Sequence, residues 1–493
     1  MIDRRFLFFM TLVLVANELV SFAVSQNTVA GVAAFFVISA MFLAIALLST
    51  DFALLIVIAE LVVGGKGYLY HFAVGSFDVS IRLSLFVILL IVWLLKRRYK
   101  KLSFFTSVQP YTAYLIALAS IVILGFLNAL VHGYPFARIF FDVNAYLYFL
   151  LAPVIFTSLE KPEQRRKLYN VFFSGILLVG LKSLVVLGIF THYGLSTVRP
   201  LYSWIRDTGV GEVAHIFANF YRVFFQSQIF GLVGFLIAFG VLAMRLLRER
   251  HDDRGGLYVI SLAGVVAILV SLSRSFWVGA AASLIVGALI LIRYRYGWRR
   301  GFLTLGLLAS LGALATGLIS WSMSFPLPFP TGGEPSGGQA LVRERFSQNQ
   351  PAVDSRRALL PAMFTRIGQH PAIGTGFGST ITYSSSDPRI ARDGKPARFT
   401  TSAFEWGWLD IAVKMGLVGV IIYIIFLKRL IHDCALRLRA LRDEVSAVSF
   451  GLLLALIGLA VTHVFSPYLN HPLGIGIVLL SAALLRAMPV KTV

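Results

Sequence analysis

Runs of about twenty apolar residues recur along almost the whole 493-residue chain, and this feature limits its possible folds most strongly. A helix of that length crosses the hydrocarbon core of a bilayer. Hydrophobic residues make up 58% of the chain before glycine is added, and only 14% of residues are charged. A soluble domain has about 45–50% apolar residues with glycine included, and about 25% charged residues. The sequence therefore excludes a water-soluble multidomain enzyme and predicts a polytopic membrane protein.

Windows of about nineteen residues predict about fourteen spans and one integral membrane domain over 1–493. The predicted spans are 6–25, 29–49, 52–65, 83–96, 111–131, 138–158, 168–191, 229–247, 256–273, 275–293, 301–321, 407–427, 446–465 and 472–488. The first span contains Glu18, and its length favours a retained helix over a cleaved signal peptide. Cys434 is the only cysteine, which excludes a disulfide within the chain.

Basic residues gather on alternate connections between these spans. With the amino terminus inside, the clusters that flank short loops share one face, as the positive-inside rule requires. They lie at 96–101, 161–167, 245–254, 293–300 and 428–442, with Lys491 at the carboxyl end. We therefore expect a multi-pass protein of the cytoplasmic (inner) membrane with both termini in the cytoplasm. The net charge of +21 then comes from basic clusters that fix the topology beside anionic lipid headgroups, and no nucleic-acid partner is expected.

Two connections on the opposite face are long, at about 192–228 and about 322–406. The second begins with a Pro/Gly-rich run at 325–338 and is basic from there onward. Within it, 355–369 has apolar residues spaced for one helix face and arginines on the other. This pattern predicts an amphipathic helix at the outer membrane boundary.

Familiar catalytic motifs such as the P-loop, GxSxG, HExxH and CxxC are absent from the sequence. The glycine-rich segment 373–380 has two interpretations. Its backbone N–H groups could form a nest for an anion, or its glycines could simply permit turns. No metal site and no cofactor are predicted.

Arg274 lies at the outer end of a predicted span with almost no loop after it. A cation at that depth needs a partner or a polar cavity, unless its side chain snorkels to the interface. Arg222 ends the first long outer connection, and Arg356 lies in the second. A guanidinium group can bind two phosphate oxygens at once, so these three arginines suggest an outer site for a phosphorylated ligand.

Several carboxylates and lysines interrupt the apolar spans. Asp410 and Lys414 are four residues apart on one predicted helix, which favours an ion pair, whereas Asp142 has no partner recognisable from the sequence. The same holds for Glu60 and Lys182. Glu405 lies where the large outer connection re-enters the membrane. Two roles are open for it: a general base, or an ordinary carboxylate at a helix start.

Three stretches of the chain resemble the O-antigen ligase and polymerase family of polysaccharide-assembly membrane proteins. They are Ser271-Leu272-Ser273-Arg274, then Ser355-Arg356 with the segment 369–378, and finally 405–419. The resemblance covers roughly 256–430. Together with the hydropathy windows, it predicts a GT-C-like, all-α bundle of about fourteen transmembrane helices with two long extracytoplasmic loops.

The resemblance implies a metal-independent, inverting glycosyltransferase whose donor is a polyprenyl-diphosphate-linked glycan. Arg274 and Arg356 match arginines that bind the diphosphate in this family, and Arg222 is a less certain third. The family's proposed base is a histidine, but its position falls on Glu405 here, so either Glu405 or another loop residue such as His370 is expected to act. The other expected substrate-binding residues in this loop are Arg357, Arg366, His370, Gly376 and Gly378.

The number of spans and the two basic outer loops favour a polymerase of O-antigen or exopolysaccharide repeat units. Two alternatives stay open: a ligase that transfers the glycan to a lipid A-like or protein acceptor, and a transporter or flippase of lipid-linked oligosaccharide. The expected partners are the lipid-linked glycan, membrane lipid, a chain-length regulator and a flippase.

Overall fold

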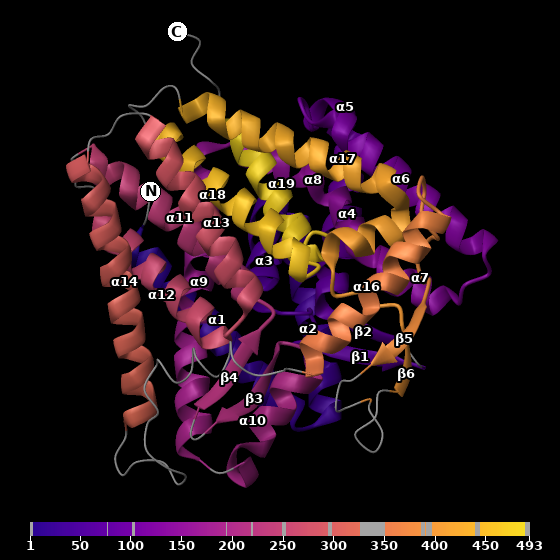
Figure 1. The fold of residues 1–493 in the computed structure, drawn as a ribbon, viewed down its shortest axis with the longest axis horizontal. Coiled ribbons are helices and arrows are strands. Elements are labelled where there is room, and N and C mark those ends of the chain that lie inside the picture. Colours follow the sequence, from indigo (N-terminus) through magenta and orange to yellow (C-terminus); the bar gives the residue numbers. More distant parts are fainter. Residues whose placement is uncertain are drawn as a thin grey trace.

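The computed structural model describes most of the chain as a bundle of helices with three small hairpins (Figure 1). The described residues are 3–75, 77–100, 104–193, 195–217, 220–248, 253–293, 298–325, 351–385, 390, 397–438 and 444–488. The Pro/Gly-rich run after 325 and parts of four basic clusters (101, 249–252, 294–297, 439–442), together with Lys491, lie outside these ranges.

The helices follow the predicted apolar segments closely. They are α1 (Arg4–Ser25), α2 (Thr28–Leu48), α3 (Thr50–Val63), α4 (Ile81–Lys100), α5 (Phe104–Ser107), α6 (Thr112–Val131), α7 (Phe136–Val143), the 3₁₀ helix η1 (Asn144–Leu151), α8 (Ala152–Leu159), α9 (Pro162–His192), α10 (Leu195–Asp207), α11 (Gln228–Leu247), α12 (Arg254–Ser271), α13 (Arg274–Arg293), α14 (Trp298–Ser324), α16 (Pro351–Gln369), α17 (Gly407–Leu438), α18 (Glu444–Phe465) and α19 (Pro472–Ala487).

Three antiparallel hairpins interrupt the helices: β1 (His71–Val74) with β2 (Phe77–Ser80), β3 (Gly211–Phe217) with β4 (Phe220–Phe225), and β5 (Ile381–Ser385) with β6 (Ala397–Thr401).

The expected all-α polytopic membrane fold is confirmed. Within the described residues, 11 helical segments are long and apolar enough to cross a membrane, with α7, η1 and α8 forming one of them. The expected count of about fourteen is not confirmed, because α3, α4 and α19 are outside this set. The 14 residues of α3 and the 16 of α19 extend only about 21–24 Å, less than the hydrocarbon thickness. The α4 helix carries Arg82 near its start and a basic segment at its end.

The two long connections fold into structures of their own. The first contains α10 and the β3–β4 hairpin, and the described part of the second contains α16 and the β5–β6 hairpin. Figure 1 shows both hairpins and α10 toward one end of the bundle, while α5 lies at the other end. The apolar side chains Leu359 and Met363 of α16 are buried against Ile381, Phe404 and Val413. Much of the apolar face expected at the membrane boundary is thus covered by the protein itself.

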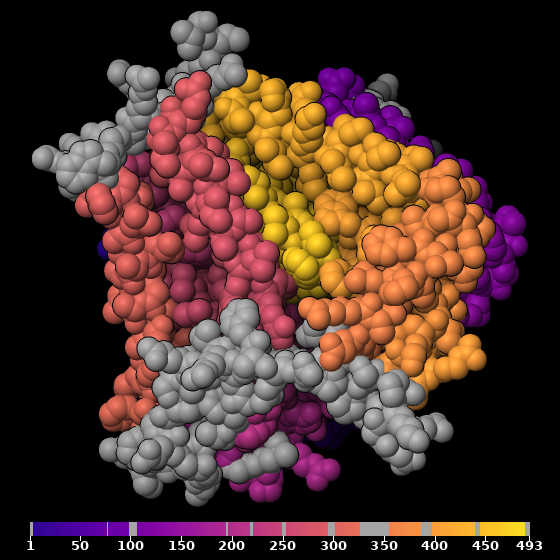
Figure 2. Space-filling view, viewed as in Figure 1, coloured from indigo at the N-terminus to yellow at the C-terminus, as the bar shows by residue number. Residues whose placement is uncertain are grey.

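The space-filling view shows a hollow on one side of the bundle, between α13 and α17 (Figure 2). The more C-terminal helices form its floor. Apolar side chains of α13 and α17 are exposed, among them Ile285 and Ile421. Such surfaces suit contact with lipid chains.

Charges inside the bundle are paired across helices. Lys182 on α9 lies 2.5 Å from Glu18 on α1, measured from Nζ to Oε1, and both side chains are less than one tenth exposed. Arg82 on α4 binds both carboxylate oxygens of Glu60 on α3, each at 2.9 Å. These contacts supply the partners that the sequence did not reveal for Glu60 and Lys182. An ion in this setting is tolerated only when it is neutralised in this way.

Replacing Lys182 with methionine tests how much the buried Lys182–Glu18 ion pair contributes to stability. We expect Lys182→Met to reduce stability by about 3–5 kcal/mol, because Glu18 would be left as an uncompensated buried charge. The measurement is thermal unfolding in detergent. Lys161→Met is the matched control, since Lys161 pairs with Asp51 but its side chain is 56% exposed. Such pairs contribute about 0–1 kcal/mol. Equal losses in the two variants would contradict the expectation.

Candidate functional site

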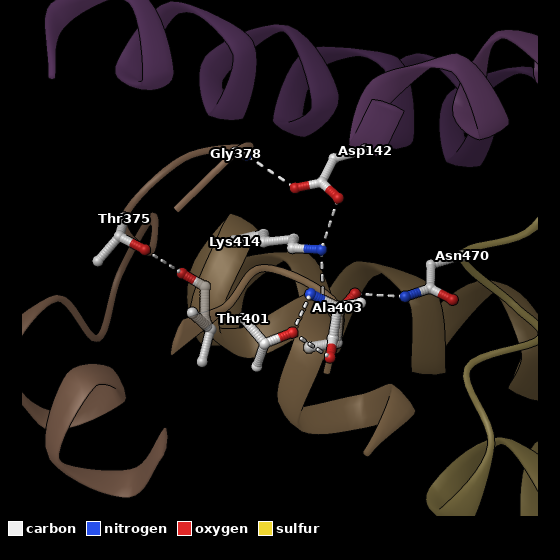
Figure 3. Close-up of polar contacts among 9 residues, drawn as sticks. Asp142, Thr375, Gly378, Thr401, Ala403, Lys414 and Asn470 are labelled. Carbon is white, nitrogen blue, oxygen red and sulfur yellow. Dashed lines mark hydrogen bonds and ion pairs between the residues drawn. The ribbon is translucent and has the colours of Figure 1, made fainter. Parts of the chain in front are cut away.

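Lys414 on α17 is held by two carboxylates from different parts of the fold (Figure 3). Its Nζ lies 2.8 Å from Oδ1 of Asp410, one turn earlier on the same helix, and 2.9 Å from Oδ1 of Asp142 on α7. The amide of Asn470 donates to the other oxygen of Asp410. The predicted Asp410–Lys414 pair is confirmed, and the sequence did not reveal Asp142 as a second partner. We call these four residues the Lys414 cluster.

The glycine-rich segment packs directly onto this cluster. The Gly378 N–H donates to Oδ2 of Asp142 at 2.7 Å, so the anion bound here is a carboxylate of the protein (Figure 3). The neighbouring amides of Thr375, Gly376 and Phe377 donate to backbone carbonyls of α17 and α6 at 2.8, 3.1 and 3.3 Å. These backbone contacts occupy the N–H groups that an anion nest would offer to a substrate phosphate, so the glycine-rich segment is held by packing contacts instead.

Glycine is required in this segment for two physical reasons. Gly374, Gly376 and Gly378 have φ values of +69°, +86° and +78°, where a side chain is strained. A Cβ at Gly376 would lie 2.6 Å from the backbone nitrogen of Ala129. The glycines therefore allow the segment to lie tightly between α6 and α17.

Arg222 and Arg274, which we call the arginine pair, lie on adjoining elements at the end of the bundle that carries the hairpins. Arg222 on β4 donates through Nε to the carbonyl of Ser271 at 2.9 Å, three residues before Arg274. The guanidinium of Arg222 also lies 4.9 Å from the ring centre of Phe224. Burial, and to a smaller degree the positive charge of Arg274, lower the pKa of Arg222, and Glu212 opposes this change. Two guanidinium groups within electrostatic reach of one another favour an anion between them.

Arg356 and Glu405 form an ion pair at the start of α17. Their side chains are 47% and 49% exposed, so this pair faces solvent rather than a closed pocket. The indole of Trp406 donates to the carbonyl of Arg356 at 3.0 Å and fixes α16 beside the start of α17. The position of Glu405 two residues before α17 fits both a general base and a helix-start carboxylate.

A short series of contacts connects Arg274 with this ion pair. Ser275, the next residue, lies 3.0 Å from Ser466 between their hydroxyl oxygens. The neighbouring Phe465 packs against Trp406, with ring centres 5.9 Å apart. The residues that follow 274 and 405 in the sequence therefore both contact the C-terminal end of α18.

The other predicted binding residues lie elsewhere on α16 and beyond it. Arg357 is exposed, whereas Arg366 and His370 are partly buried. At 1.5 Å per residue, Arg366 is about 15 Å from Arg356 along the helix. The ring of His370 meets that of His132 edge-on, with centres 6.2 Å apart. Arg366 and His370 therefore lie at the end of α16 opposite to the Arg356–Glu405 ion pair.

The structure also contains a cavity of about 530 Å³ that the sequence did not reveal. The start of α4, α7, η1, the segment at Phe404 and the connection before α19 surround it. Its charged and polar lining residues are Lys66, Asp78, Ser80, Arg82, Asp142, Asn144, Asp410, Lys414, Asn470 and His471, with Tyr68, Tyr146 and Tyr148. Within the described ranges, no group of three or more His, Cys, Asp or Glu side chains is arranged to hold a metal ion.

Residues 257–424 match the family model described as O-antigen ligase. This range contains Arg274, Arg356 and Glu405, whereas Arg222 and most of the cavity lining precede it. A comparison with curated proteins finds no matching relative.

The packing role of the glycine-rich segment predicts different outcomes for two alanine variants. Gly376→Ala should reduce stability by at least about 1–2 kcal/mol, because a left-handed φ and the contact with Ala129 both oppose a side chain. Gly368→Ala, in α16 with open space around it, should leave the melting temperature unchanged or raise it. Thermal unfolding in detergent gives both values. A melting temperature for Gly376→Ala at or above that of Gly368→Ala would disprove this packing role.

Proposed function

Because residues 257–424 match the O-antigen ligase family model, we propose that the chain belongs to the O-antigen ligase and polymerase family and is a polysaccharide polymerase of the cytoplasmic membrane. It joins polyprenyl-diphosphate-linked repeat units at the outer face, and both termini lie in the cytoplasm. The observation that supports this function most directly is that the arginine pair and the Arg356–Glu405 ion pair flank the same end of α18.

The donor's diphosphate binds at the arginine pair. Charge develops on the diphosphate as the bond to the sugar breaks, and fixed guanidinium groups stabilise that charge without a metal ion. The first turn of α13 begins at Arg274, and its apolar side chains Val278 and Ile285 are exposed farther along the helix. The polyprenyl chain lies along this apolar surface, beside the hollow seen in Figure 2.

The acceptor hydroxyl attacks the anomeric carbon from the side opposite the diphosphate. The new C–O bond forms as the bond to the diphosphate oxygen breaks with its electron pair, and the hydroxyl proton passes to the carboxylate of Glu405. This displacement inverts the anomeric centre. Arg356 positions Glu405 through their ion pair. His370 is the alternative base, although it lies at the far end of α16.

Transfer to a lipid A-like or protein acceptor is the second candidate function, because the matching family model carries the description O-antigen ligase. Polymerase and ligase share the donor and the displacement step, and they differ in the acceptor alone. In either function, a flippase supplies the lipid-linked donor to the outer face. A chain-length regulator acts with the polymerase.

Turnover of lipid-linked glycan by the purified protein tests the proposed function. We expect release of polyprenyl diphosphate together with longer glycan on the same carrier. Glycan on a new carrier would identify a ligase, and the absence of released diphosphate would refute glycosyl transfer.

Arginine substitutions test the proposed diphosphate site. Arg274→Ala should lower kcat by about 10²–10³-fold, because a fixed donor to the developing charge is lost. Arg274→Lys should also be strongly impaired, since the ammonium cannot bind two oxygens in the same way. Arg398→Ala is the matched control, because Arg398 is an exposed arginine on β6 and lies outside the arginine pair. Retention of normal kcat in Arg274→Ala would exclude this site.

Glu405→Gln tests the proposed base. We expect a fall in kcat of about 10²–10⁴-fold with little change in KM, because glutamine keeps the shape of the side chain but accepts no proton. Asp207→Asn, which alters an exposed carboxylate at the end of α10, is the control. A rate for Glu405→Gln close to that of the wild type would remove Glu405 from the mechanism.

A further inference from the structure

Two buried tyrosines that line the cavity have hydroxyls with no hydrogen-bond partner among the described residues. They are Tyr146 and Tyr148 on η1, and each residue is only 5% exposed. An unsatisfied buried hydroxyl is costly, so we expect its hydrogen bond to come from ordered water or from a bound polar ligand. The cavity that both tyrosines line has a volume of about 530 Å³, within the range of small-molecule sites. We call it the tyrosine cavity.

The cations of the tyrosine cavity are largely neutralised by the protein. Lys414 contacts two carboxylates, and Arg82 is bound by both oxygens of Glu60. The remaining charged lining residues, Lys66 and Asp78, have opposite signs. The lining therefore has no surplus of positive charge, which gives little attraction for a diphosphate and suits an uncharged polar ligand.

The rest of the lining combines aromatic rings with amide groups. Phe86 stacks on Tyr148 with ring centres 5.4 Å apart, and Phe77 packs against Phe140 at 5.1 Å. Asn144 supplies an amide that can both donate and accept hydrogen bonds. Sugar rings present an apolar C–H face that packs on aromatic rings, and an edge of hydroxyls that both donate and accept. Phosphates, by comparison, only accept hydrogen bonds unless they are protonated.

We propose that the tyrosine cavity binds uncharged sugar residues at the acceptor end of the glycan. The assignment to the acceptor rests on the proposed function, which places the donor's diphosphate at the arginine pair, outside the cavity lining. The cavity reaches Phe404, the residue next to Glu405. A glycan held there has its terminal hydroxyl on the side of the proposed base. Because most of the lining precedes residue 257, sugar specificity is determined largely outside the matched family segment.

Direct binding tests the proposal without requiring turnover. The probe is the free repeat-unit oligosaccharide, released by mild acid from the lipid-linked glycan of the source cells, and the readout is saturation-transfer NMR with titration. Tyr148→Phe and Tyr146→Phe should each weaken binding by about fivefold to tenfold, because each removes one hydroxyl. Tyr258→Phe should bind like the wild type, although it loses a 3.1 Å hydrogen bond to Ser310, because Tyr258 does not line the cavity.

A cavity-filling variant distinguishes a loss of binding from a loss of folding. Ala137 lines the cavity and is exposed, so Ala137→Trp should block binding while leaving the melting temperature unchanged. Unweakened binding in Ala137→Trp and in both phenylalanine variants would overturn the proposal.

Inorganic pyrophosphate is the second probe and separates the two proposals. Its binding should weaken in Arg274→Ala and stay unchanged in Tyr148→Phe. If the protein shows no turnover but its saccharide binding weakens in the tyrosine variants, the cavity proposal is supported and the proposed function is refuted. If turnover is normal but saccharide binding is unchanged in the tyrosine variants, the proposed function is supported and the cavity proposal is refuted. Pyrophosphate binding that falls in Tyr148→Phe would make the cavity a phosphate site and overturn the saccharide proposal.

Discussion

The ammonium of Lys414 and its two carboxylates form the contact on which the arrangement of the site depends. An unpaired charge at this depth in a membrane protein is costly, so Lys414 fixes the places of Asp142 and Asp410. Asp142 in turn binds the Gly378 amide, which holds the glycine-rich segment against α6 and α17. One charged group thereby joins α7, α17 and the large outer connection into a rigid frame.

Two different chemical environments are connected through the start of α17. The arginine pair offers positive charge, whereas the tyrosine cavity offers paired charges, aromatic rings and two hydroxyls without a partner among the described residues. Phe404 lines the cavity, and Trp406 contacts Phe465, whose neighbour Ser466 contacts Ser275 beside Arg274. A glycosyl transfer needs this division, because a charged leaving group and a neutral sugar acceptor require different surroundings.

The sequence predicted features that depend on local spacing. The membrane class, the positions of the helices and the Asp410–Lys414 pair follow from apolar runs and from the i,i+4 geometry of a helix. Asp142 could not be recognised as a partner, because 272 residues separate it from Lys414. The missing hydrogen-bond partners of the Tyr146 and Tyr148 hydroxyls, among the described residues, could not be predicted because they depend on packing among distant segments. The glycine-rich segment matched an anion nest in composition, but tertiary contacts take up its amides.

The position of a bound polyprenyl diphosphate, determined by electron cryo-microscopy of the protein in a lipid nanodisc, tests the central claim most directly. We predict that the phosphate oxygens lie within hydrogen-bonding distance of the guanidinium groups of Arg222 and Arg274, with the lipid chain along α13. Density for the diphosphate at the end of the bundle that carries α5, or density contacting neither arginine, would contradict the account.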